Sequence, residues 1–144
     1  MTSKQSKFIT LAVSAVLLFA GVASAQDVSA GSFTLPVETR WGLATLPPGN
    51  YTYRLPSAAL PAVVIVSGQG QKVMIMVTAG TSQHDVSDRS SLTLIRGGQK
   101  AFVRSFDLGH LGTTFYYRPP KGQNVFMAQQ PELIQRIPAI ATGK

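Results

Sequence analysis

The chain has 144 residues, of which 44% are hydrophobic and 13% charged, with 13 Lys and Arg against six Asp and Glu. This balance is typical of a packed globular protein and excludes an intrinsically disordered one. There is no cysteine, which excludes disulfides, thiolate catalysis, Cys-ligated zinc and iron–sulfur clusters.

The first 25 residues have the layout of a secretory signal peptide. Two lysines are followed by an uncharged, apolar run over residues 8–22, and Ala23-Ser24-Ala25 supplies the small–x–small pattern of a cleavage site. We expect cleavage between Ala25 and Gln26, and export to the periplasm or the outside. The alternative is a permanent anchor, but a spanning helix needs about 20 apolar residues, and residues 8–25 supply 18. Membrane contact is therefore expected only through the signal peptide during export.

Residues 26–144 remain as one domain, because 119 residues are too few for two ordinary ones. Two of the 13 basic residues lie in the signal peptide, which leaves 11 against six acids, a net charge of +5. The basic residues are scattered singly. Such an excess attracts anions, such as envelope polymers, without selecting one, and a plain solvated surface is the favoured interpretation.

The first predicted strand covers residues 32–37, with Phe33, Leu35 and Val37 on one face and a break or sheet edge at Pro36. Residues 38–44 continue it past a bend at Gly42.

The stretch "LPPGNYTYRL" at 46–55 predicts a turn at Pro48-Gly49 and then a strand, together forming a hairpin. Tyr51, Tyr53 and Leu55 share one face of this strand. We expect the tyrosine rings to pack inward, and a ligand platform is the alternative.

Two unalternating apolar runs, "AVVIV" at 62–66 and "VMIMV" at 73–77, predict a hairpin that is apolar on both faces. Such strands are expected at the centre of a sheet, covered on each side. Residues 79–90 are expected to form a polar surface loop.

The second half of the chain predicts further strands. A hairpin pairs 91–95 with 101–108 across Gly97-Gly98, and a strand at 113–118 places Phe115 and Tyr117 opposite Tyr116. The last strand covers 132–140 and is interrupted at Pro138, with a short strand or turn at 125–128. No helical periodicity is sustained. We therefore predict an all-β fold, an antiparallel β-sandwich or partly open β-barrel of seven to nine strands.

The sequence offers little for catalysis. His84 lies in "HDVSD", whose order matches neither an EF-hand loop nor a zinc signature. His110 follows Asp107, but no G-x-S-x-G elbow supplies a nucleophile. We predict no catalytic residue, metal ligand or cofactor. The alternative is a hydrolase or metal-dependent enzyme that uses His84 or His110.

Aromatic residues next to arginines suggest one candidate ligand patch, formed by Arg40, Trp41, Tyr53 and Tyr117. Such side chains stack on sugar rings, so this patch predicts binding of a surface glycan. The favoured alternative is that Trp41 anchors the core. Nucleic acid is not expected as a partner, because an exported protein meets little of it.

The segments "FTLPVETRWGLATLPPGNYTYRL" and "SSLTLIRGGQKAFVRSFDLGHLGTTFYYRPPKG", with the closing "IQRIPAIATGK", resemble a group of small exported bacterial β-rich proteins of unknown function. The resemblance implies export and a β-rich fold, and it assigns no site residue. Together these observations predict a non-enzymatic envelope domain, either structural or binding an envelope protein or anionic polymer.

Overall fold

The computed structural model of the protein describes residues 26–121 and 133–142. The predicted signal peptide and the predicted element at 125–128 lie outside these residues. Within the described residues, eleven strands and one 3₁₀ turn (Gly109–Leu111) make up the regular structure. In chain order they are β1 (Ser29–Leu35), β2 (Glu38–Trp41), β3 (Ala44–Leu46), β4 (Gly49–Leu55), β5 (Val63–Gly68), β6 (Gln71–Met76), β7 (Gly80–Gln83), β8 (Ser90–Gly97), β9 (Lys100–Leu108), β10 (Thr113–Tyr116) and β11 (Leu133–Ala141).

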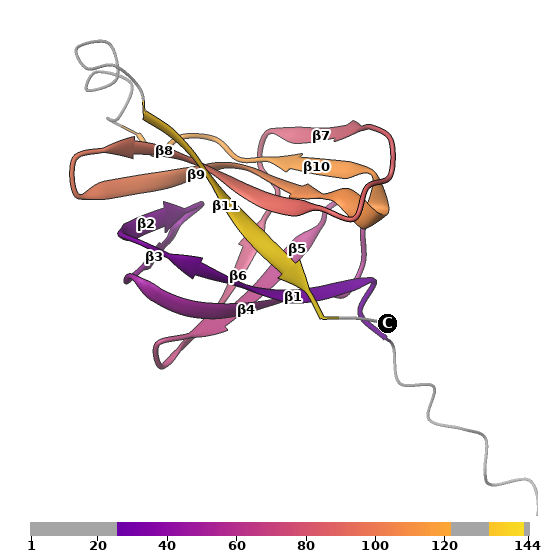
Figure 1. Ribbon diagram of the computed structural model, residues 1–144, viewed down its shortest axis with the longest axis horizontal. Helices are drawn as coiled ribbons and strands as arrows, with labels where there is room; N and C mark the ends of the chain where they lie inside the picture. The colour runs from indigo at the N-terminus through magenta and orange to yellow at the C-terminus, as the bar shows by residue number, and fades with distance from the viewer. Residues whose placement is uncertain (1–25, 122–132, 143–144) are drawn as a thin grey trace, which may run out of the picture.

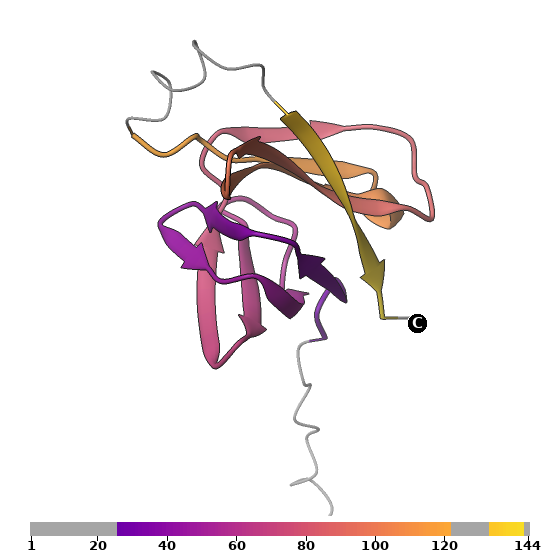
Figure 2. The ribbon, with the colours of Figure 1, turned by 60° about the vertical axis from the view of Figure 1, so that its left-hand side comes forward.

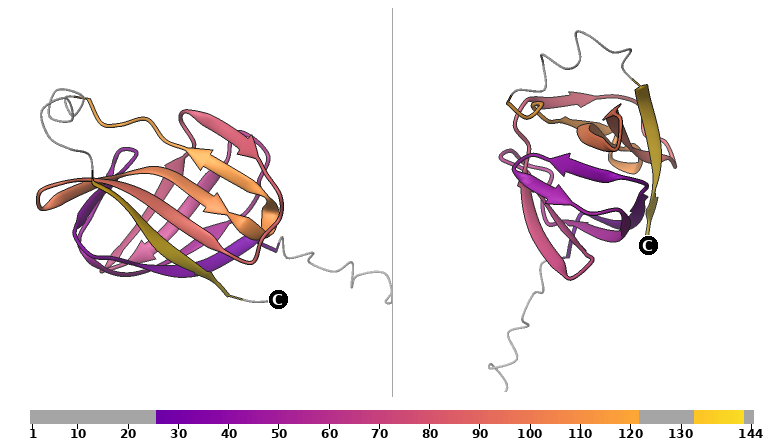
Figure 3. Two further views of the ribbon diagram at one scale, coloured as in Figure 1. Left: turned by 45° about the horizontal axis from the view of Figure 1, so that its top comes forward. Right: turned by 90° about the vertical axis from the view of Figure 1, so that its left-hand side faces the viewer.

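The strands form a nearly closed barrel. Nine of them lie side by side in the order β3-β2-β9-β8-β11-β1-β4-β5-β6, and β10 joins β7 to β9. Figure 1 shows β7 to β10 in an upper layer and β1, β4, β5 and β6 in a lower one, with β11 running diagonally between them. The strands of the two layers cross at a steep angle in Figure 2, and the views in Figure 3 show how they curve around a common interior. The predicted all-β class is therefore confirmed, and the nine strands of the barrel path agree with the predicted seven to nine, with β7 and β10 lying off this path.

The core lies between these layers and is rich in aromatic rings. Strand alternation directs Phe33, Tyr51 and Tyr53 inward. Trp41 is fully buried, and the rings of Phe106, Tyr117 and Phe33 meet it edge-on at 5.6, 5.5 and 5.9 Å between centroids. Edge-to-face contacts of this kind add to the free energy gained by burial. The predicted inward packing of Tyr51 and Tyr53 is confirmed.

The β5–β6 hairpin forms as predicted, but its predicted central position is wrong. Among the described residues, β6 ends the sheet and pairs only with β5. Its inward side chain, Ile75, is buried, whereas Met74 and Met76 are 73% and 55% exposed. An unalternating apolar run therefore does not prove burial on both faces, because flexible methionines occupy the solvent side here.

Several local predictions also need correction. Residues 80–83 of the expected polar loop form β7, because Thr114 and its neighbours in β10 supply a partner for this short polar segment. The Pro47-Pro48 turn joins β3 to β4, which do not pair, so no hairpin forms there. One pairing, β2 with β9, is parallel, and every other one is antiparallel.

The final strand, β11, runs through Pro138 without a break, against the prediction. Within residues 26–121 and 133–142, no helix has the length and apolarity needed to cross a membrane.

Candidate functional site

The seam between β1 and β11 is closed at one end. Gly31 lies opposite Ala141 and Ser32 opposite Ile140, and the Thr142 amide donates to the Ala30 carbonyl at 2.9 Å. The two strands approach closely here because Gly31 has no side chain. A Cβ at this position would overlap the Ile140 carbonyl oxygen and the Tyr53 ring.

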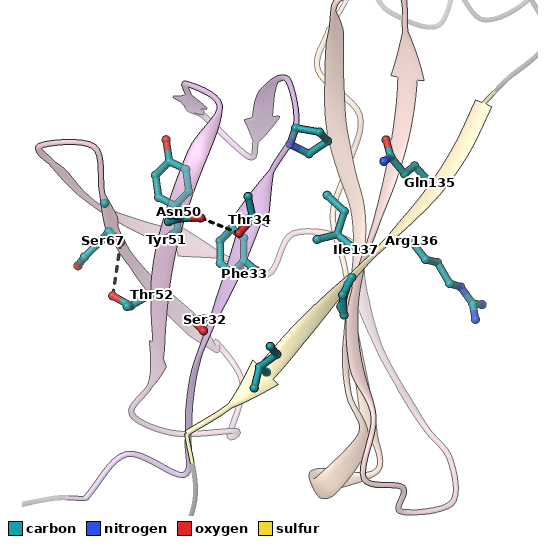
Figure 4. A pocket seen from close by; sticks show the side chains of 14 residues that line it. Ser32, Phe33, Thr34, Asn50, Tyr51, Thr52, Ser67, Gln135, Arg136 and Ile137 are labelled. Carbon is teal, nitrogen blue, oxygen red and sulfur yellow. Dashed lines mark hydrogen bonds between the residues drawn. The ribbon is translucent and has the colours of Figure 1, made fainter.

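At the other end of the seam the two strands separate. β1 continues to pair with β4, and residues 133–139 of β11 pair with β8. Within the described chain, no backbone pairing joins residues 33–35 to 133–139. Figure 4 shows the resulting V-shaped opening, with Ile137 between the two strands. The groove measures about 770 Å³, within the range of small-ligand sites.

Strand geometry determines which backbone groups face this groove. Successive residues of a strand direct their N–H and C=O groups to opposite sides. Since the Ala30 carbonyl faces β11, the same side of β1 carries the N–H and C=O of Ser32 and Thr34. By the same rule Arg136 and Pro138 face β1. Pro138, which has no N–H, therefore removes no bond from the ladder with β8, and β11 continues through it.

The groove has an apolar floor and a polar rim. Phe33, Tyr51 and Ile137 are buried side chains that line it. At the rim the Thr34 hydroxyl donates to Asn50 Oδ1 at 2.7 Å. The exposed Arg136 projects outward from β11, as Figure 4 shows. Among the described residues no Asp or Glu lines the groove, and Arg136 gives this lining a positive charge.

The candidate glycan patch predicted from the sequence does not form a surface. Trp41, Tyr53 and Tyr117 are at most 3% exposed, and only Arg40 of the four faces solvent. The packing interpretation is thus the one the structure supports. Within the described chain, Trp41 Nε1 and the Tyr117 hydroxyl are buried without a hydrogen-bond partner. Burial raises the pKa of Tyr117 far above its usual range.

The structure brings together His84 and Asp107, which the sequence analysis had not paired. His84 Nε2 lies 2.7 Å from Asp107 Oδ1, and Nδ1 lies 2.8 Å from the Asp85 carbonyl oxygen. Both ring nitrogens face acceptors, so the protonated imidazolium satisfies both. The Asp85 carbonyl, and then the Asp107 carboxylate, accordingly raise the pKa of His84. This arrangement leaves no ring nitrogen free to deprotonate a serine.

His110 is separate from this pair, and its Nδ1 is buried without a hydrogen-bond partner among the described residues. In the same part of the chain, no three His, Asp or Glu side chains gather in a way that would hold a metal ion.

No protein-family model, no curated protein and no solved structure matches the chain. The groove was not predicted from the sequence. One signal for it was present, since a proline inside an otherwise regular strand pattern indicates that one side of the strand lacks a neighbour. The predicted interruption of the strand at Pro138 is a different interpretation of the same signal, and it is wrong, because β11 continues through this residue.

Proposed function

We propose that the chain is exported and that residues 26–144 act as a non-enzymatic binding domain of the cell envelope. The groove between β1 and β11 is the proposed binding site. One observation carries the assignment. Over an apolar floor, the groove exposes two strand edges whose backbone groups have no pairing partner in the described chain.

The proposed export is supported by the signal-peptide layout of residues 1–25 and by the resemblance to small exported bacterial proteins. The absence of cysteine is compatible with an oxidising compartment, since no thiol is present to mispair there. Mass spectrometry of the purified protein is expected to find Gln26 at the N-terminus. An intact N-terminal segment would contradict export by this route.

The hypothesis of a non-enzymatic protein is supported by the contacts of His84, because both of its nitrogens are already engaged. A structural domain without a ligand would not need the groove, and closure of the seam along its whole length would be more stable. Each additional backbone hydrogen bond contributes about 1 kcal/mol. The open end of the seam therefore favours binding over a purely structural role.

Site-specific crosslinking tests the proposed site in living cells. A photo-crosslinking amino acid replaces Thr34 at the groove rim or, as the control, Arg104, an exposed residue of β9 that does not line the groove. We expect discrete adducts in the envelope fraction from position 34 and none from position 104. Identical patterns from both positions, or no adduct from position 34, would contradict the proposed function.

A further inference from the structure

We infer that the ligand of the groove is an extended, acidic peptide segment of a partner protein, bound as an additional strand between β1 and β11. This inference rests on the proposed function, since it names the class of ligand for the same groove. Four properties of the groove lead to it: the backbone edges, the floor, the length and the charge.

The backbone edges favour a peptide over other polymers. β1 presents the N–H and C=O of Thr34 to the groove, and β11 presents the N–H and C=O of Arg136 and the C=O of Pro138. A ligand that satisfies them needs donors and acceptors at the spacing of a strand, about 3.3 Å per residue. Strand addition to an open sheet edge uses main-chain bonds of this kind. A sugar chain has no matching repeat.

The floor accounts for the side chains of such a peptide. Every second residue of an inserted strand points toward the interior, where Phe33 and Ile137 offer buried apolar contacts. The other residues point outward, toward Thr34 and Arg136. We therefore expect apolar residues to alternate with polar ones in the ligand.

Two prolines limit the length of the pairing. Pro36 follows the last residue of β1, and Pro138 lies within β11, and both line the groove. Neither proline can donate a backbone hydrogen bond, and a proline at the edge of a sheet limits how far another chain can pair with that edge. The usable part of β1, from Phe33 to Pro36, spans about four residues. A short segment fits here, and a long sheet-forming chain does not.

Charge selects an acidic ligand. Arg136 is exposed at the rim and makes no ion pair within the described chain. Nearby, Arg96 Nη1 donates to Gln135 Oε1 at 3.4 Å, which places a second guanidinium close to the groove lining. Since the described residues of the lining include no carboxylate, an Asp or Glu on the outward side of the peptide would pair with Arg136.

A library of random decapeptides, panned against the exported protein purified from the envelope, tests the inference. We expect enriched peptides to alternate apolar and polar residues and to carry an acidic residue. Arg136→Gln is expected to weaken the binding of an enriched peptide about tenfold, whereas the matched change Arg104→Gln leaves it unchanged. Methylation of alternate backbone nitrogens in the peptide removes the N–H groups that face one of the two neighbouring strands, and it is expected to abolish binding. A peptide bound only through its side chains would still bind after this methylation.

The outcomes separate this inference from the proposed function. Enrichment without alternation, or binding that survives methylation of either set of nitrogens, would overturn the inference. So would adducts from position 34 that resist protease and contain an anionic polysaccharide, although the proposed function would then stand. If neither a peptide nor a polysaccharide is found at position 34, both fail.

Discussion

The two ends of the β1–β11 seam use the same pair of strands and behave differently. At the closed end, Gly31 and Ser32 pair with Ala141 and Ile140, whereas past Ser32 each strand pairs only with its other neighbour. Three of the four residues at the closed end, Gly31, Ser32 and Ala141, are small, and Pro36 and Pro138 flank the open end. The comparison indicates that two strands pair where small residues let their backbones approach, and that pairing stops beside prolines, which have no N–H to donate. The inward apolar side chains of both strands, such as Phe33 and Ile137, are buried even where the strands do not pair.

The largest effect is expected from Gly31→Val, which tests the closed end. The new side chain would overlap the Ile140 carbonyl and the Tyr53 ring, so the free energy of unfolding should fall by about 3 kcal/mol. Urea denaturation measures it. Gly97→Val is the control, because nothing lies within 4 Å of a Cβ at that position. Equal losses in both variants would show that the close approach at Gly31 does not matter.

A smaller loss is expected from Ile137→Ala at the open end. Ile137 is 6% exposed and belongs to the core as well as to the groove, so its truncation should cost about 2 kcal/mol. Ile140→Ala makes the same change on a side chain that is 68% exposed, and it should cost less than about 0.5 kcal/mol. If the two variants unfold at the same urea concentration, the floor of the groove is not packed as described.

Hydrogen exchange compares the two ends directly. The Ser32 amide faces Ile140 across the closed seam, and the Thr34 amide faces the groove. We expect the Thr34 amide to exchange about tenfold faster, because it lacks one backbone hydrogen bond. An enriched peptide should then slow the exchange of Thr34 and leave that of Ser32 unchanged. Equal protection of both amides in the free protein would mean that the seam is closed throughout.

The smallest effect concerns pH and lies away from the seam. Folding raises the pKa of His84 above its ordinary value of 6.5. The protonated His84 side chain therefore contributes its full stabilisation below pH 6.5, and this contribution is lost as the pH rises through the pKa of the folded state. Urea midpoints measured from pH 5.5 to 8.5 should therefore fall more in the unmodified protein than in His84→Gln. A parallel pH dependence in both proteins would contradict this role for the His84–Asp107 pair.

Much of the fold could be predicted from the sequence, because alternation is a local signal. The inward faces of β1, β4 and β10 follow directly from the spacing of Phe33, Tyr51 and Phe115 and their neighbours. The sequence also predicts the β5–β6 hairpin, from its two apolar runs, and the β8–β9 hairpin, from the turn at Gly98. The order of the strands in the sheet could not be predicted, since it depends on pairings between residues that are distant in the sequence. This is why β6 was wrongly placed at the centre.

The site was less predictable for the same reason. The groove exists because β11 changes partner along its length, from β8 at residues 133–139 to β1 at residues 140–141, and Pro138 is the one local signal of this change that the sequence carries. Likewise, His84 meets Asp107 only because β10 lies between β7 and β9. The sequence shows that aromatic residues lie next to arginines, but it does not show that these aromatic side chains are buried. Their burial depends on which face of each strand packs against the core.

The pairing of Gly31 with Ala141 also bears on when the protein becomes functional. These residues lie 110 positions apart in the sequence (141 − 31), and contacts so distant in sequence close late during folding. The seam can form only after residues 140–142 have been synthesised. Until then the edges of β1 and β11 that face this seam are unpaired, and a chaperone acting at that stage would meet the same backbone groups that line the groove.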